Sequence, residues 1–159
     1  MIASRKIPVF LLHMLLGTSF LSGCICNAPD VDRHFFRDSA RETVRYFRYA
    51  IDANQHQAAY QCLTASSQQQ ISPIAFEALI RFVDVQELGG VGLKDLLMES
   101  VVARAEEQVT GAPESRWITL MWSSDDQFIE YSLLLSPDES GTWWIDILST
   151  RGVDLGSPT

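Results

Sequence analysis

Apolar residues recur at helical spacing in two stretches of the first half of the chain. The first stretch runs from Ser39 to about Ala53, and one side of its helical wheel holds Ala40, Val44, Phe47, Ala50 and Ile51. Ser39 and Glu42 form an S-x-x-E capping box there, because both side chains can satisfy free backbone N–H groups of a first turn. The second stretch begins at Ser72 and Pro73, a favoured pair for the N-cap and first helical position. Its apolar face consists of Phe76, Leu79, Ile80 and Val83.

The segments around these two helices are shorter. Gln57–Leu63 is typical of a short helix, and Ser66–Gln70 is interpreted as a polar loop. Leu93–Ser100 fits either a helical turn or the entry to a strand. The glycines at 89, 90 and 92 lack the G-x-G-x-x-G order and the following Lys-Ser/Thr of phosphate-binding loops, so they are interpreted as turn residues.

From Val101 onward the apolar residues alternate with a period of two, which predicts strands. Four runs rich in branched or aromatic residues begin at Val101, Trp117, Phe128 and Trp143. Short turn-like connections separate them, which favours an antiparallel meander. Helices followed by such a meander predict an α+β fold with the N-terminal helices packed on one face of a curved antiparallel sheet of about four strands.

The turns also predict which strand residues share a face. If Asp125 and Glu139 are the turn centres, one almost wholly apolar face holds Trp117, Thr119, Met121, Ile129, Tyr131, Leu133, Leu135, Trp143, Ile145 and Ile147. We expect the helices to cover this face. The opposite, mixed face then holds Ile118, Leu120, Trp122, Phe128, Glu130, Ser132, Leu134, Trp144, Asp146 and Leu148.

The N-terminus carries an export signal. Arg5 and Lys6 precede an apolar run, 7–20, that is too short for a transmembrane helix, which needs roughly 20 apolar residues. The following Leu-Ser-Gly-Cys, 21–24, resembles the lipobox of bacterial lipoproteins, in which the cysteine is acylated and becomes the new N-terminus. The alternatives are an ordinary secretory signal or an uncleaved anchor. The predicted organisation is a signal peptide (1–23), a tether (24–38), one domain (39–149) and a C-terminal tail (150–159).

Cleavage before Cys24 changes the charge of the chain. Arg5 and Lys6 are lost with the signal, so 10 Lys and Arg face 20 Asp and Glu in the mature chain, a formal charge of −10. Nucleic acid is therefore excluded as a partner, because binding its phosphates needs a basic surface. The membrane partner is reached through the lipid on Cys24. A row of arginines beside the first helix is interpreted as a solvated face, partly paired with neighbouring carboxylates: Arg41, Arg45 and Arg48.

Two further cysteines need an interpretation. Once Cys24 carries the lipid, Cys26 and Cys62 are the two cysteines that remain. In an oxidising compartment a disulfide between them is one interpretation. The other makes Cys62 a small buried apolar residue and Cys26 a chance residue of the tether. If the cell has two membranes, Ile25 after Cys24 resembles proteins forwarded to the outer membrane.

The predicted domain resembles the NTF2-like (cystatin-like cone) superfamily. The resemblance rests on Glu42–Phe47 opening the first helix, on Asn54–Leu63 forming the second, and on the final strand Thr142–Leu148 with its two tryptophans. It implies isomerases, dehydratases or hydrolases, or small ligand-binding and accessory domains. A fold alone does not choose among these activities.

Candidate chemistry in this domain is sparse. The resemblance implies that an enzyme would place an aspartate, a histidine or a carboxylate pair inside the cone, whereas the apolar face predicted here has only Thr119 and Tyr131 as polar groups. The carboxylates within strand cores, Glu130 and Asp146, are the alternative acid–base pair on the mixed face. The scattered histidines, 13, 34 and 56, give no metal-ligand spacing, and no cofactor is expected.

The mixed sheet face instead predicts an interaction surface. Its apolar residues are Trp122, Phe128, Trp144 and Leu148, and exposed together they would make a larger patch than monomers usually carry. A second copy of the chain or an envelope protein is the expected partner. The sequence thus predicts a membrane-anchored envelope lipoprotein with a non-catalytic interaction or small-ligand-binding domain; the alternative is an enzyme that uses Glu130 and Asp146.

Overall fold

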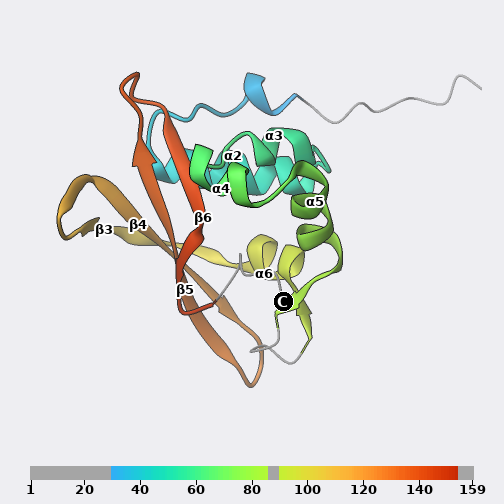
Figure 1. Ribbon diagram of the computed structural model, residues 1–159. Helices are drawn as coiled ribbons and strands as arrows, with labels where there is room; N and C mark the ends of the chain where they lie inside the picture. The colour runs from blue at the N-terminus through green and yellow to red at the C-terminus, as the bar shows by residue number, and fades with distance from the viewer. Residues whose placement is uncertain (1–29, 86–89, 154–159) are drawn as a thin grey trace, which may run out of the picture.

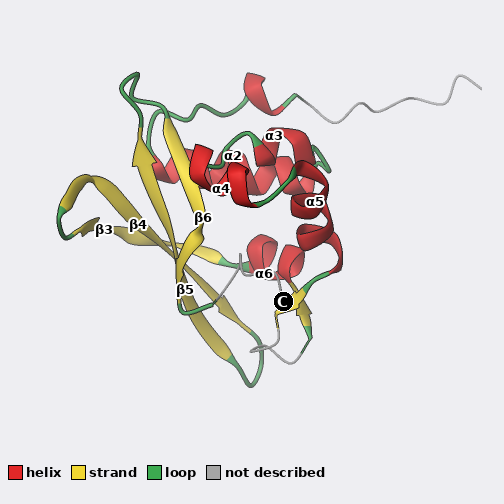
Figure 2. Cartoon of the chain, in the orientation of Figure 1, coloured by secondary structure: helices red, strands yellow, loops and turns green. Residues whose placement is uncertain are grey.

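The computed structural model describes residues 30–85 and 90–153 (Figure 1). In the folded molecule the helices lie on one side and a four-stranded antiparallel sheet of order β3-β4-β5-β6 lies on the other (Figure 2). The predicted α+β class is therefore confirmed. The helical elements are η1 (Val31–Arg33), α2 (Ala40–Asp52), α3 (His56–Tyr60), α4 (Ala65–Gln70), α5 (Pro73–Phe82) and α6 (Leu93–Glu99). The strands are β1 (Asp84–Val85), β2 (Val91–Gly92), β3 (Val101–Val109), β4 (Ala112–Ser123), β5 (Phe128–Pro137) and β6 (Trp143–Arg151).

Helix α2 begins as its capping residues predict. The Glu42 N–H donates to Ser39 Oγ at 3.3 Å, and the Thr43 hydroxyl donates to the Ser39 carbonyl at 2.9 Å. The other half of the predicted capping box does not form between the described residues Ser39 and Glu42, because the Glu42 carboxylate pairs with Arg45 at 2.7 Å instead. The predicted apolar side of α2 is entirely buried: Ala40, Val44, Phe47, Ala50 and Ile51. Burying this stripe against the sheet fixes α2 as the central helix, because each fully buried large apolar side chain contributes about 1.5–3 kcal/mol.

One expected loop is helical, and one segment left open between helix and strand is also helical. The predicted polar loop at 66–70 is wrong, because Thr64 Oγ1 accepts the Ser67 N–H at 3.2 Å and caps helix α4. The ambiguous segment 93–100 forms α6, which buries Leu93, Leu96 and Leu97. Helix α5 begins at Pro73 with Ser72 as its N-cap, as predicted. The small β1–β2 pairing was not predicted.

The β4–β5 register differs from the prediction by one residue. Ile118 pairs with Leu133 and Leu120 pairs with Tyr131, because the loop has four residues, 124–127, closed by the Ser124 N–H on the Gln127 carbonyl at 2.9 Å. A one-residue slip moves every side chain of a strand to the other face. The β4 residues on the helix-covered face are therefore Ile118, Leu120 and Trp122 rather than Trp117, Thr119 and Met121.

The β5–β6 hairpin keeps the predicted faces at its turn. Leu135 pairs with Ile145 and Leu134 with Asp146. A bulge follows, since the next β5 residue, Leu133, pairs with Thr150. Asp146 Oδ1 accepts the Leu148 N–H at 3.1 Å within this bulge. The bulge redirects the end of β6 toward the core.

Both edges of the four-stranded sheet are occupied locally. On β6, Ile145 exchanges backbone hydrogen bonds with Cys62 and Thr64, at 2.8 and 2.9 Å. On β3, three residues, 103–105, lie opposite a single β4 residue, and Arg41 Nη2 donates to the Ala103 and Arg104 carbonyls at 2.8 and 2.7 Å. A bulge and a bound arginine interrupt the edge that β3 would otherwise offer to another strand.

The domain boundaries of the structure are wider than the predicted 39–149. Val31, within the expected tether, is 1% exposed in the core, and the Trp143 N–H donates to the Arg37 carbonyl at 2.9 Å. At the other end β6 continues to Arg151 and Val153 is 3% exposed. The described parts of the expected tether and tail therefore belong to the domain; residues 24–29 and 154–159 lie outside the described residues.

Candidate functional site

The predicted interaction surface of four apolar residues is not formed. Trp122 is only 5% exposed, because the β4 slip turns it toward α6. Leu148 packs against the core after the β6 bulge. Trp144 is half-buried, with the Arg37 guanidinium 4.4 Å from its ring centre. Phe128 alone stays well exposed, at 63%, so this prediction was wrong.

The sheet face away from the helices is mostly polar and internally paired. Thr119 and Ser132 share a hydrogen bond of 2.9 Å across β4 and β5. Trp117 is 8% exposed because Arg151 lies 4.0 Å over its ring, and Arg151 pairs with Glu107 at 3.1 Å. These pairs leave little apolar area for a partner at the centre of this face.

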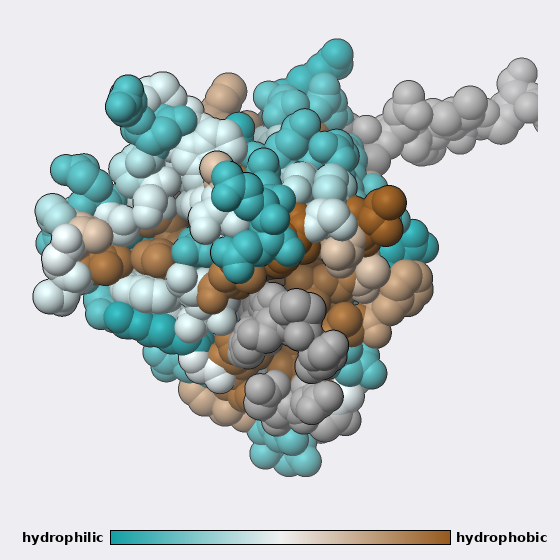
Figure 3. Space-filling model, in the orientation of Figure 1, coloured by the Kyte–Doolittle hydropathy of each residue, from teal (hydrophilic) through white to brown (hydrophobic). Residues whose placement is uncertain are grey.

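The most exposed large apolar side chains of the described residues lie on α5. Ile74 is 83% exposed and Phe82 is 75% exposed, and they are eight positions apart on the helix. Figure 3 shows hydrophobic surface at the right-hand side, over α5, whereas the top of the molecule is mainly hydrophilic. Nothing in the structure shows what covers the α5 surface.

Glu130 and Asp146 do not form an acid–base pair. Asp146 pairs with Leu134, four residues further along β5 than Glu130, which is about 13 Å along a strand. Asp146 also holds structural hydrogen bonds, since it accepts from Ser67 Oγ at 3.0 Å and from Ser149 Oγ at 2.8 Å. The Asp146 carboxylate therefore joins α4 to the β6 bulge. Glu130 is exposed at a separate position on β5.

The interior polar group that was correctly predicted is Tyr131, which is 1% exposed. Its hydroxyl donates to Ser100 Oγ at 3.0 Å, and burial raises the pKa of Tyr131 to about 12. Arg48 Nη2 donates to the Met98 and Ser100 carbonyls at 2.6 and 2.7 Å. A neutral phenol in such a network anchors β5 to α6 and α2.

Arg41 and Arg48 are not part of a solvated row, because both bind backbone carbonyls of other elements.

The histidines are separated in the structure. His34 is exposed beside η1, and His56 begins α3 with a buried Nδ1 that has no hydrogen-bond partner within the described residues. Burial lowers the pKa of His56, so this imidazole is neutral near pH 7. In ranges 30–85 and 90–153, no three His, Cys, Asp or Glu side chains gather as metal ligands. The same ranges contain no helix long and apolar enough to span a bilayer.

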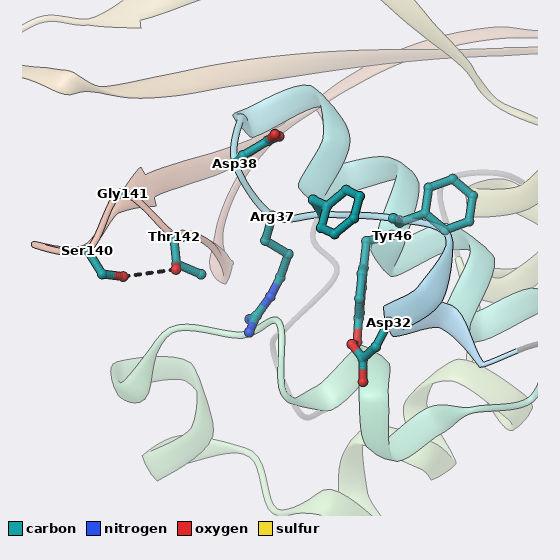
Figure 4. Close-up of a pocket in the computed structure, with 9 residues that line it drawn as sticks. Asp32, Arg37, Asp38, Tyr46, Ser140, Gly141 and Thr142 are labelled. Carbon is teal, nitrogen blue, oxygen red and sulfur yellow. Dashed lines mark hydrogen bonds between the residues drawn. The ribbon is translucent and has the colours of Figure 1, made fainter.

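A cavity of about 350 Å³, hereafter the N-terminal pocket, lies between the chain before α2 and the β5–β6 turn (Figure 4). Its lining residues are Asp32, Phe35, Phe36, Arg37, Asp38, Tyr46, Ser140, Gly141 and Thr142. The segment 32–38 is held in place by its fixed ends: Val31 is in the core, and the Arg37 carbonyl binds the Trp143 N–H. Its volume lies within the range of small-molecule sites.

Arg37 provides the positive charge of the N-terminal pocket. Its Nη1 donates to the Gln61 carbonyl at 2.9 Å, and its guanidinium lies between Trp144, 4.4 Å from the ring centre, and Tyr46, at 5.7 Å. Among the described residues no carboxylate forms an ion pair with it. A guanidinium has five N–H donors, so Arg37 has donors to spare for a ligand.

Asp32 and Asp38 provide the negative charges. The Tyr46 hydroxyl donates to Asp32 Oδ1 at 2.6 Å, while Figure 4 shows Asp38 on the far side of Arg37. Burial, and then this hydrogen bond, raise the pKa of Tyr46 well above its ordinary value, so Tyr46 is a neutral donor. No hydrogen bond to the Asp38 carboxylate or to Asp32 Oδ2 is present within the described residues.

The β5–β6 turn closes the pocket with hydroxyl groups. Asp138 Oδ1 accepts from the Ser140 N–H, the Ser140 hydroxyl and the Thr142 N–H, at 2.8, 2.6 and 3.0 Å. Asp138 Oδ2 accepts the Trp144 Nε1–H at 3.0 Å. This carboxylate is therefore fully engaged within the turn, and Ser140 and Thr142, whose hydroxyls share a hydrogen bond of 2.9 Å, line the pocket.

A second cavity of about 240 Å³ lies on the other side of Phe35. Its lining residues are Phe35, Arg45, Arg48, Tyr49, Asp52 and Met98. The Phe35 and Tyr49 rings lie 4.9 Å apart, and Arg45 lies 5.6 Å over Phe35. Its arginines are already engaged by Glu42 and by backbone carbonyls, so the N-terminal pocket is the stronger candidate site.

The sequence interpretation missed the N-terminal pocket entirely. Arg37 meets both Tyr46 and Trp144, the latter more than a hundred positions away, and the segment that carries Arg37 was expected to be a tether. The signal that was present is the pair Phe35 and Phe36 just before the capping box, since two aromatic residues are unusual in an unattached polar linker.

No protein family matches the chain, and no curated protein or solved structure is significantly similar to it. Fold class and pocket geometry are therefore the basis of the functional proposal.

Proposed function

We propose that this chain is a lipid-anchored protein of the cell envelope whose non-catalytic domain binds a small polar ligand in the N-terminal pocket. Cys24 is the lipidation site in this proposal, and an outer-membrane location follows if the cell has two membranes. The NTF2-like relationship belongs to the proposal as well. Its support is the α+β arrangement of helices against a four-stranded antiparallel sheet.

One observation carries the ligand-binding part. The N-terminal pocket combines an arginine that has no ion pair within residues 30–85 and 90–153 with two exposed carboxylates and two phenylalanines, in a cavity of about 350 Å³. Small-molecule sites typically pair apolar walls with a few convergent polar groups. The enzyme alternative has less support, because Asp146 is engaged in the β6 bulge and Glu130 is distant from it.

Metabolic labelling with a fatty acid tests the anchor. The wild-type protein should incorporate the label, Cys24→Ser should lose it and accumulate as precursor or soluble form, and Cys26→Ser should keep it as the matched control. Label that persists on Cys24→Ser, or a wild-type protein without label, would contradict lipidation at this residue.

Native mass spectrometry of protein purified gently from envelopes tests the binding site. We expect a bound small molecule on the wild type whose occupancy falls in Phe36→Ala, because Phe36 lines the pocket and is 68% exposed. Phe128→Ala is the matched control, since Phe128 is equally exposed but lies at the β4–β5 turn. Equal occupancy in both variants, or an empty wild type, would contradict the proposed site.

A further inference from the structure

The position of the N-terminal pocket relative to Cys24 limits which surface can meet the membrane. Val31 is fixed in the core, 1% exposed, with its N–H donating to Gln55 Oε1 at 3.4 Å. It follows Cys24 by seven positions, and seven residues span at most about 25 Å when fully extended. A domain of this size is about 35 Å across. If Cys24 is in the bilayer, the end of the domain opposite η1 cannot touch the same bilayer.

The N-terminal pocket lies at the η1 end of the domain, which is the end that can touch the bilayer. All of its lining residues come from the chain around η1, from α2 and from the β5–β6 turn. Figure 1 shows η1, the chain leading to α2 and the β5–β6 turn together at the top, and the β4–β5 turn at the bottom. The pocket is therefore among the parts of the domain nearest to the anchor.

The charges of the pocket fit a ligand that carries both signs. Arg37 offers N–H donors and lacks a carboxylate partner among the described residues, which suits a phosphate. The Asp32 carboxylate, across Arg37 from Asp38, suits an ammonium group. Because Asp32 and Asp38 outnumber the single arginine, an anion without a positive group would be repelled.

Phe36 suits a lipid surface next to that ligand. It lines the pocket and is 68% exposed, unlike its neighbour Phe35, which packs against the core. Phenylalanine enters the boundary between head groups and acyl chains, where burial of its ring is favourable.

We propose that the N-terminal pocket binds the ammonium–phosphate head group of a zwitterionic phospholipid in the leaflet that holds the anchor, with Phe36 inserted beside it. The phosphate lies on Arg37 and the ammonium group on Asp32. This inference rests on the proposed lipidation of Cys24. It makes the domain lie on its membrane with a fixed orientation.

The test uses the acylated full-length mature protein in two kinds of vesicle, one of phosphatidylglycerol alone and one with added phosphatidylethanolamine. Two variants, Phe36→Trp and Phe128→Trp, each place a tryptophan at one exposed phenylalanine. The quenching of tryptophan fluorescence by brominated acyl chains is compared between each variant and the unsubstituted protein. We expect quenching of the residue at 36 that grows with the phosphatidylethanolamine fraction, and none at 128. Asp32→Asn should raise the half-saturating fraction about fivefold, the size of one exposed charge contact, whereas Glu130→Gln should leave it unchanged. Both carboxylates are exposed, so neither change should threaten folding.

The outcomes separate the anchor from the head-group site. A protein that carries no acyl chain overturns both. An acylated, vesicle-bound protein with unquenched tryptophan at 36 and no response to phosphatidylethanolamine overturns the head-group site alone. Soluble phosphoethanolamine that competes at micromolar concentration would assign the pocket to a free ligand, and equal competition by ethanolamine would reduce it to a cation site; either result overturns the lipid assignment.

Discussion

Trp122 and Glu99 join β4 to α6 by a hydrogen bond of 2.9 Å from the indole Nε1 to a carboxylate oxygen. The indole is 5% exposed, so its ring fills the core while its polar edge reaches the end of α6. A buried indole needs such an acceptor, because an unpaired buried N–H lowers stability. This residue was expected to bind a partner and instead holds a helix on the sheet.

Replacing Trp122 therefore tests the observed face of β4. Trp122→Ala should lower the free energy of unfolding by about 3–5 kcal/mol, as for large-to-small changes of buried aromatic residues. Phe128→Ala, at an exposed position, should change it by less than about 0.5 kcal/mol. Urea unfolding followed by circular dichroism gives both values. Similar small effects at the two positions would restore the original face assignment.

Asp146 should behave as a structural carboxylate. Asp146→Ala removes the acceptor of the Ser67 hydroxyl, whose residue is fully buried, and should cost about 1–3 kcal/mol of unfolding free energy. Glu130→Ala, at an exposed position on β5, should be nearly neutral. Thermal unfolding of both variants is the measurement. A neutral Asp146→Ala together with loss of some turnover would revive the enzyme alternative.

Gly152 should not tolerate a side chain. Its φ is +85°, and an added Cβ would lie too close to the Glu130 carbonyl oxygen, so the end of β6 or β5 would have to move. Gly152→Ala should cost more than the roughly 1–2 kcal/mol of a positive φ alone. Gly111→Ala is the control, because Gly111 has φ +84° with nothing within 4 Å of the added atom. Equal losses of stability at the two sites would show that residues after 150 are the tail that the sequence suggested.

The β5–β6 turn should be acid-sensitive in a defined window. Hydrogen bonds, first from the Ser140 hydroxyl, lower the pKa of Asp138 to about 2. Because the folded-state pKa lies below the unfolded value of about 3.9, the stabilisation is complete above pH 4 and is lost as the pH falls toward 2. Carboxyl-carbon NMR should show a midpoint near 2 for Asp138. A midpoint near 4 would mean that the turn bonds do not persist in solution.

Cys62 should be an inert thiol in the folded protein. It is fully buried, its Sγ donates to the Ala58 carbonyl at 3.4 Å, and burial raises its pKa to about 12. With Cys24 and Cys26 replaced by serine, a thiol reagent at pH 8 should react only as fast as the domain opens, and at once in urea. Rapid reaction without denaturant would contradict the burial. The structure has Cys62 as a free thiol, and since Cys26 lies outside the described residues, a bridge between them stays a prediction.

Local signals in the sequence were sufficient for the main elements. Ser39 and Ser72 cap α2 and α5 because capping depends on side chains within three residues of each other. The β4–β5 turn was not determined in this way. Ser124 and Asp126 favour a turn of either three or four residues, and the choice depends on which tryptophan, 117 or 122, finds an acceptor and a helix to pack against. That choice is made by tertiary packing.

The N-terminal pocket shows the same limit at longer range. Phe35 and Arg37 are in a segment with no periodicity of its own, and their positions depend on Tyr46, Trp144 and the edge of β6. Arg41 likewise looked solvated on a helical wheel, yet it binds carbonyls on β3. Contacts between residues so far apart in the chain leave no pattern in a single sequence.

The interrupted β3 edge has a consequence under the proposed lipid anchoring. An anchor on Cys24 would concentrate copies in two dimensions, where an open strand edge would template strand-to-strand polymerisation. Arg41 occupies the Ala103 and Arg104 carbonyls and pairs with Glu106 at 3.4 Å, so an incoming strand would have to displace a charged side chain to extend the sheet. With that anchor, the bulge would let neighbouring copies crowd on one membrane while each sheet stays four strands wide.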